Sequence, residues 1–283
     1  MKPYIFALTA IISTLLVLLS TFRDGNTHND ASVIRVGFEQ HRVGTVYDYY
    51  AQSKDWNVVW SKSDWMNNYT MITDSQAHSQ TKALRITYPA NATAGGSAAW
   101  KLPEEKEYYL SYWVKFEEDF DFDGSKKSGG KLPGLAGAGG YCSGGQICTG
   151  ENGFSSRYMW GENGRVKLYL YHMNKPTKWG ENFWLEDSEG QDVYFQRGKW
   201  HNLIQRVKIN DGFLANGEID VWMDGEQMLS LRGLQFVNNY KSIDSLMFST
   251  FHGGNSSDWW PEREVHSYFD DFVISTSARD VGL

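Results

Sequence analysis

The chain has 283 residues and a formal net charge of −7 at pH 7, from 27 basic and 34 acidic residues. Hydrophobic residues make up 41% and charged residues 22%, a globular composition that excludes a disordered, collagen-like or coiled-coil chain. The negative charge argues against a general nucleic-acid-binding protein. Two cysteines are too few for a disulfide-rich scaffold or a tetrahedral cysteine zinc site. The 15% aromatic content indicates a core or a groove built from large rings.

The N-terminus begins with an uncharged apolar run over residues 5–22. Its length lies between that of a signal-peptide apolar region and that of a short membrane span. We interpret residues 1–22 as an export signal, with an uncleaved membrane anchor as the alternative, and residues 23–32 as a polar linker. The protein is therefore expected outside the cytoplasm, extracellular or periplasmic, with one folded domain over residues 33–283.

Short segments that alternate between apolar and polar residues recur between turn residues after the linker. This period of two predicts β-strands, and no long window has the 3.6-residue period of a helix. Many short strands joined by polar turns predict an all-β sandwich or barrel. The expected strands are 33–38, 56–60, 83–88, 97–102, 108–116, 154–160, 165–173, 200–209, 218–223, 245–251 and 267–274.

One glycine-rich, aromatic stretch, residues 124–180, differs from the rest in charge. It carries eight basic and two acidic residues, a net charge of +6, whereas the remainder of the chain carries −13. This stretch predicts a site for an anion, with a solvated basic face as the alternative. The basic residues are Lys126, Lys127, Lys131, Arg157, Arg165, Lys167, Lys175 and Lys178.

The run of glycines in residues 127–140 lacks the order of a phosphate-binding loop, so nucleotide binding is excluded. Glycine also permits close approach of the backbone to a ligand or a neighbouring strand. Lys131 is then either a lone cation on a tight scaffold or a plain surface lysine. Cys142 and Cys148 lie six residues apart, and in an exported protein they are expected to form a local disulfide that fixes the loop before the next strand.

Residues 161–164, Gly-Glu-Asn-Gly, predict a hairpin turn between two strands. If the turn pairs residues of equal parity, Ser155 and Arg157 share a face with Tyr169 and Tyr171. A slip by one residue would separate them. Two tyrosines beside an arginine are also common on an ordinary exposed sheet face. The cluster nevertheless suits an anionic sugar, because tyrosine stacks on sugar rings and arginine pairs bidentately with a carboxylate.

The chain resembles polysaccharide lyase family 14, which includes alginate and glucuronan lyases. The resemblance runs from about residue 82 to the end. The segments that carry it are GGKLPGL (129–135), the two-cysteine loop, GFSSRYMW (153–160), YLYHMNK (169–175), GKWHNLIQRVKIN (198–210) and STFHGGNSSDWWP with YFDDFVIS (249–275).

The resemblance implies a jelly-roll β-sandwich with a concave substrate-binding sheet. It also implies cleavage of a polyuronate by β-elimination, with unsaturated uronate ends as products. The family's lysine falls on Lys131, its serine and arginine on Ser155 and Arg157, and its two tyrosines on Tyr169 and Tyr171. The substrate implied is alginate, mannuronate-rich alginate foremost, or glucuronan. The uronate preference and the choice between endo and exo action stay open.

The chemistry can also be argued independently of the family. Removal of the proton at C5 of a uronate needs a neutralised carboxylate, a base, and an acid for the leaving oxygen. Arg157 and Lys131 are expected to stabilise the charge, and Tyr169 or Tyr171 to transfer the proton with a pKa lowered by the neighbouring cations. Lys131 as the base is the alternative. Ser155 is expected to contact the substrate.

Two further substrate contacts are expected, Lys167 on the tyrosine face and His252 in a loop that reaches the groove. His172 has the opposite parity and is expected off this face. A glycosidase would need a carboxylate pair, and residues 124–180 contain only Glu151 and Glu162, the latter in the turn. The competing class is a non-catalytic jelly-roll protein that binds carbohydrate with the same aromatic residues.

No cofactor is expected for catalysis. Glu39 and Asp271, near the two ends of the domain, could meet on adjacent strands and bind a structural calcium ion through their oxygens. The alternative is ordinary exposed acids at strand ends. The expected partner is an anionic polysaccharide, with no nucleic acid and no obligate protein partner, and the protein is expected to be a monomer.

Overall fold

The structure, a computed structural model, describes residues 33–254 and 256–283. The expected export segment, residues 1–22, and the linker, residues 23–32, lie outside the described residues. Within the described ranges, no helix has both the length and the apolar character that a membrane crossing requires.

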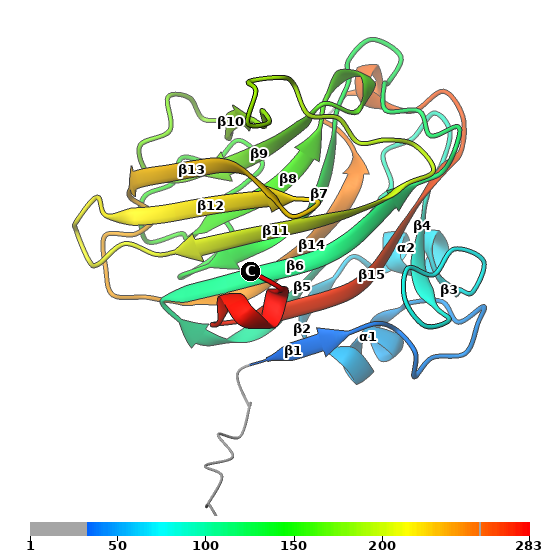
Figure 1. Ribbon diagram of the computed structural model, residues 1–283, viewed down its shortest axis with the longest axis horizontal. Helices are drawn as coiled ribbons and strands as arrows, with labels where there is room; N and C mark the ends of the chain where they lie inside the picture. The colour runs from blue at the N-terminus through cyan, green and yellow to red at the C-terminus, as the bar shows by residue number, and fades with distance from the viewer. Residues whose placement is uncertain (1–32, 255) are drawn as a thin grey trace, which may run out of the picture. The chain divides into compact units, whose positions relative to one another are not determined.

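Two antiparallel sheets pack face to face and form the jelly-roll β-sandwich expected from the sequence (Figure 1). The eight-stranded sheet has the order β13-β12-β11-β6-β15-β4-β3, with β1 paired to β15. Its strands are β1 (Ile34–Val36), β3 (Thr70–Thr73), β4 (Ala83–Tyr88), β6 (Glu107–Phe116), β11 (Trp200–Lys208), β12 (Gly217–Met223), β13 (Glu226–Leu234) and β15 (Val265–Ser275).

The seven-stranded sheet has the order β10-β9-β8-β7-β14-β5-β2. Its strands are β2 (Asn57–Ser61), β5 (Gly95–Glu105), β7 (Gly130–Gly137), β8 (Phe154–Trp160), β9 (Val166–Tyr171), β10 (Glu181–Trp184) and β14 (Ile243–His252). Two short helices, α1 (Tyr49–Asp55) and α2 (Ser63–Tyr69), flank β2 in the chain. The described residues also form the 3₁₀ turns η1 (Glu162–Gly164), η2 (Ser257–Trp259) and η3 (Ala278–Val281).

The core lies between the sheets and is filled by aromatic and branched side chains. On β9, Leu168 and Leu170 are fully buried in this core. Because successive strand residues point to opposite faces, Lys167, Tyr169 and Tyr171 face the other side of the sheet. The alternation that fills the core therefore also places a row of polar side chains on the outer face of the seven-stranded sheet.

Strand β7 is missing from the sequence prediction because glycine and proline are depleted in strands. In the structure its glycines are required by close packing. A Cβ atom at Gly130 would lie 1.8 Å from the ring of Trp160, and one at Gly134 would lie 1.8 Å from the carbonyl oxygen of Ser156. Pro133 lies where the pairing of β7 with β8 shifts register, between Lys131 and Gly134. Proline has no N–H to donate, and it is tolerated at such an irregularity of a sheet. The expectation of close backbone approach to a neighbouring strand is confirmed.

Strands β3, β10 and β13 and both helices were also absent from the prediction. Strands β10 and β13 are sheet edges with much exposed surface, so their sequences carry no clean alternation. Each helix has seven residues, which is too short for a recognisable 3.6-residue period.

Candidate active site

A cavity of about 610 Å³ opens on the outer face of the seven-stranded sheet. Four basic side chains line it, and none of the described residues in its wall is a carboxylate. The basic residues are Lys127, Lys131, Arg157 and Lys167, and the aromatic ones are Tyr169, Tyr171, Trp179, Phe251 and Trp259. Of the four cations, Lys127 is neutralised by Asp258 at 3.0 Å. The wall therefore keeps a net positive charge that favours an anionic ligand.

The pairing of β8 with β9 confirms the expected register of the hairpin. Ser155 lies opposite Tyr171, and Arg157 lies opposite Tyr169. Directly opposed residues share a sheet face, so all four side chains leave the same side of the sheet. The equal-parity turn that the sequence suggested is thus the one that forms.

Lys131 lies on β7 beside this cluster. Its Nζ donates a hydrogen bond to the carbonyl oxygen of Gly253 at 3.2 Å and lies 4.8 Å from the centre of the Tyr169 ring. Burial, and then the charges of Arg157 and Lys167, hold the pKa of Lys131 well below its usual value of 10.5. The lowered pKa means that this amine gives up its proton more readily than an exposed lysine does.

Arg157 lies beneath the cavity with only 3% of its surface exposed. Its Nη1 donates to Ser249 Oγ at 3.4 Å, and its Nε has no partner among the described residues. Burial lowers its pKa to about 10, so the guanidinium still carries its charge at neutral pH. A buried cation with unused donors that faces a cavity is suited to pair with a bound carboxylate.

The two tyrosine hydroxyls are each held by a backbone amide. Tyr169 Oη accepts a hydrogen bond from Gly180 N–H at 3.0 Å, and Tyr171 Oη accepts one from Gly145 N–H at 2.9 Å. The two oxygens are 3.5 Å apart. Burial, reinforced by Tyr171, raises the pKa of Tyr169 above its usual value. The expected lowering by nearby cations is wrong for Tyr169, because desolvation outweighs the attraction of Arg157.

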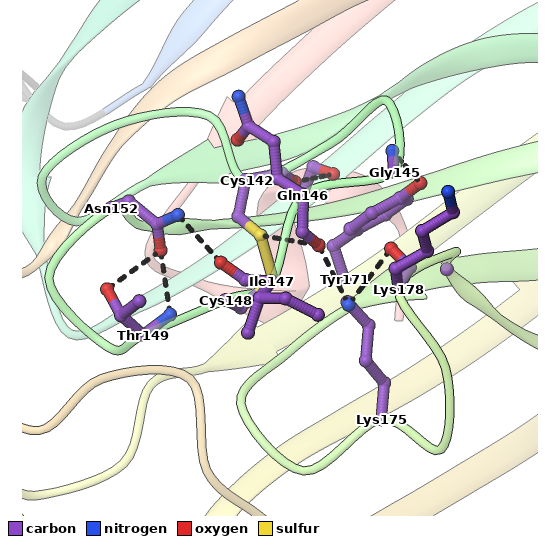
Figure 2. The surroundings of a disulfide bond; sticks show 12 residues. Cys142, Gly145, Gln146, Ile147, Cys148, Thr149, Asn152, Tyr171, Lys175 and Lys178 are labelled. Atoms are coloured by element: carbon purple, nitrogen blue, oxygen red, sulfur yellow. Dashed lines mark hydrogen bonds between the residues drawn. A yellow bond between two sulfur atoms is a disulfide. The ribbon is translucent and has the colours of Figure 1, made fainter.

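The predicted disulfide between Cys142 and Cys148 is present, and its loop covers Tyr171 (Figure 2). Lys175 Nζ anchors the same loop through the carbonyl oxygen of Gln146 at 2.8 Å. Tyr171 is left with 1% of its surface exposed. The disulfide loop, residues 142–148, thus sets the position of the amide that holds the Tyr171 hydroxyl.

Ser155 does not line the cavity, so the structure gives no support to its expected contact with substrate. Its side chain is fully buried, and its hydroxyl donates to the carbonyl oxygen of Cys142 at 2.8 Å. In this structure Ser155 supports the base of the disulfide loop. Sequence parity correctly predicted its face but could not predict that the loop would cover it.

Comparisons with known proteins identify the family. The sequence profile of polysaccharide lyase 14 matches residues 76–272. The chain belongs to the polysaccharide lyase 14 family. The resemblance drawn from the sequence motifs is confirmed, and this chain is classed with the polysaccharide lyases.

Solved structures of similar proteins share the fold. A polysaccharide lyase 14 alginate lyase from Aplysia kurodai is 25% identical, with a TM-score of 0.65 over 83% of this chain and 98% of that chain. A double mutant of alginate lyase Aly36B in complex with an alginate tetrasaccharide is 23% identical, with a TM-score of 0.72 over 87% and 97%. An endo-β-1,4-glucuronan lyase from the fungus Trichoderma reesei is 13% identical, with a TM-score of 0.53 over 80% and 93%. A comparison with curated protein sequences gave no match.

Lys167 lines the cavity, as predicted from its position two residues before Tyr169 on the same strand. Burial lowers its pKa to about 8. Of the other lining residues, the sequence placed Lys127 in the basic stretch, and alternation along β8 places Met159 on the face of Arg157. Asn182 lies on the unpredicted strand β10, Trp179 on a connection and Trp259 in η2, and the sequence does not reveal the position of these three residues.

The expectation that His252 reaches the groove from a loop is wrong. His252 ends strand β14 and is fully buried, with its ring 5.6 Å from that of Phe120 and 5.2 Å from that of Trp160. Its neighbour Phe251 lines the cavity, so His252 points to the opposite face, into the core. His172 is off the tyrosine face, as expected, and pairs with Glu181 at 2.8 Å.

Glu39 and Asp271 are held by separate partners. The Glu39 carboxylate accepts hydrogen bonds from Thr81 and Lys82, while Asp271 pairs with His78 at 2.7 Å and accepts from Ser79. Within residues 33–254 and 256–283, no group of three or more histidine, cysteine, aspartate or glutamate side chains is arranged to hold a metal ion. The structural calcium ion stays a prediction.

Proposed function

We propose that this lyase cleaves a polyuronate, alginate or glucuronan, by β-elimination and leaves an unsaturated uronate at the new non-reducing end. The observation that carries the proposal is the arrangement of Arg157, Lys131 and Tyr169 in one cavity whose described wall contains no carboxylate. A uronate needs a cation for its carboxylate, a base for C5–H and an acid for the leaving oxygen. The three side chains have these chemical capacities, and similar structures titled as an alginate lyase and a glucuronan lyase support the substrate class.

In the proposed reaction, the guanidinium of Arg157 pairs with the carboxylate of the sugar to be cleaved. This pairing stabilises the negative charge that develops when the C5–H bond breaks. The proton passes to Nζ of Lys131. The electron pair forms the C4–C5 double bond, the bond from C4 to the glycosidic oxygen breaks, and the hydroxyl of Tyr169 gives its proton to that oxygen. Afterwards Lys131 returns a proton to solvent and Tyr169 takes one up.

Lys131 is assigned as the base and Tyr169 as the acid because the site shifts their pKa values in the directions that these roles require. A base must be unprotonated at working pH, and the pKa of Lys131 is lowered. An acid must keep its proton, and the pKa of Tyr169 is raised. The hydrogen bond from Gly180 N–H to Tyr169 Oη then stabilises the phenolate formed when the proton leaves.

Tyr171 is assigned as a positioning residue. It is more deeply buried than Tyr169, and its hydroxyl lies 3.5 Å from that of Tyr169. Lys131 Nζ lies over the ring of Tyr169. Mannuronate-rich alginate is the proposed preferred substrate among the polyuronates; this preference rests on the family resemblance alone.

The proposal is tested by incubating the protein with polymannuronate, polyguluronate and glucuronan while absorbance in the unsaturated-uronate band is recorded. A rise with at least one substrate, abolished by Lys131→Ala, is expected. A non-catalytic carbohydrate-binding protein would bind these polymers and give no rise. A neutral glucan is the control substrate, and its cleavage would favour a hydrolase and contradict the proposal.

A further inference from the structure

Five directly paired residues form a transverse row across the outer face of the seven-stranded sheet. Strand pairing places Phe251 opposite Lys131, Lys131 opposite Met159, Met159 opposite Lys167, and Lys167 opposite Trp184. The first four residues line the cavity described above, whereas Trp184 lies beyond it on the edge strand β10. The row therefore extends past the reaction centre, in the direction of β10.

Trp184 has a defined position at the end of this row. A Cβ atom at Gly161 would lie 2.7 Å from the Trp184 ring, so the ring packs directly on the hairpin turn. The guanidinium of Arg165 and the Nζ of Lys167 lie 4.5 and 4.6 Å from the ring centre. Even so, 37% of Trp184 is exposed. A large ring that is anchored by its neighbours and still accessible is typical of a binding surface.

The two cations at this ring differ in whether they have an ion-pair partner. Arg165 forms an ion pair with Asp192. Lys167 makes no ion pair and donates no hydrogen bond to any of the described residues, although it is half-buried in the cavity wall. Lys167 is therefore the charge that is free to pair with a ligand carboxylate. The exposed part of Trp184 beside it can cover the apolar face of the same sugar.

We propose that Lys167 and Trp184 form a binding subsite for a second uronate residue, on the β10 side of the reaction centre. Neighbouring strands are about 4.8 Å apart, so Trp184 on β10 lies about one strand spacing beyond Tyr169 on β9. At that position Trp184 would bind the sugar next to those at the cleaved bond. This subsite rests on the proposed function for its ligand class. It adds a residue, Trp184, that binds substrate without taking part in proton transfer.

The test measures the affinity of oligomannuronates of increasing length for the Lys131→Ala protein, in which substrate is not consumed. Affinity is expected to rise by a step at the length at which the chain reaches the subsite. Adding Trp184→Ala should remove this step and weaken binding of long oligomers about tenfold. Adding Lys167→Met should weaken binding by roughly tenfold or more at low salt and by less at high salt.

The matched control is Trp222→Ala, which removes a partly exposed tryptophan from β12 of the other sheet and should leave binding unchanged. Persistence of the length step in the Trp184→Ala background would overturn the subsite. Absence of oligouronate binding in every variant would overturn both the subsite and the proposed function. Length-dependent binding that needs Trp184, in a protein whose unsubstituted form releases no unsaturated product, would support the subsite and reject only the lyase activity.

Discussion

Replacement of Tyr169 by phenylalanine isolates the proton that the reaction is proposed to need. The ring would remain edge-on to Tyr171 at 5.4 Å and beneath Lys131 Nζ at 4.8 Å, so its packing is preserved. The lost hydroxyl leaves Gly180 N–H without its acceptor, which costs about 1 kcal/mol of folding free energy because the site is open to water. Loss of a general acid lowers kcat by roughly 10²–10⁴-fold. KM should change little, since the ring still lines the cavity.

The assay follows the initial rate of unsaturated-uronate formation for Tyr169→Phe and Tyr171→Phe side by side. Tyr171→Phe removes the same atom from the neighbouring ring and is expected to cost less, because its hydroxyl only orients that of Tyr169. Thermal unfolding of both variants should stay close to that of the unsubstituted protein. Turnover by Tyr169→Phe within a few-fold of normal would refute its role as the acid, and a greater loss in Tyr171→Phe would exchange the two roles.

Three further outcomes are expected. Arg157→Lys should lose most of its kcat/KM, because an ammonium cannot reproduce the bidentate pairing of the guanidinium with a carboxylate; near-normal kinetics would exclude that pairing. The double variant Cys142→Ser, Cys148→Ser should have a lower kcat. Its free energy of unfolding, measured by denaturant titration, should fall by about 2 kcal/mol. An unchanged kcat would show that the loop does not position Tyr171. With increasing pH, kcat/KM should first rise, with an apparent pKa well below 10.5, as Lys131 loses its proton. It should fall only above pH 10, where Tyr169 loses its proton. A rise that begins only near pH 10 would instead indicate a tyrosinate base.

The hairpin cluster was predictable because parity is a local property. The turn at residues 161–164 and the alternation on both sides of it sufficed to place Arg157 and Tyr169 on one face, and the register in the structure is the expected one. The buried side of the same strands follows from the same alternation. Where the sequence has a period of two and a recognisable turn, fold and site come from one pattern.

The errors come from contacts between distant segments. His252 appeared to lie in a glycine-rich loop, but pairing of β14 with β5 and β7 extends the strand to His252 and turns its ring into the core. Ser155 has the right face and is covered by the disulfide loop. The pKa of Tyr169 depends on how deeply the assembled pocket buries it, which no spacing reveals. Strand β10, and with it Trp184, could not be recognised because a short edge strand has no buried alternation.

In the proposed mechanism, the enzyme breaks the polymer by elimination rather than by addition of water. The most direct measurement is mass spectrometry of the products formed from polymannuronate in water labelled with heavy oxygen. Elimination predicts unsaturated oligouronates that take up no label as they form, and no such products from Lys131→Ala. Saturated products that acquire heavy oxygen during cleavage would identify hydrolysis and contradict the proposed elimination.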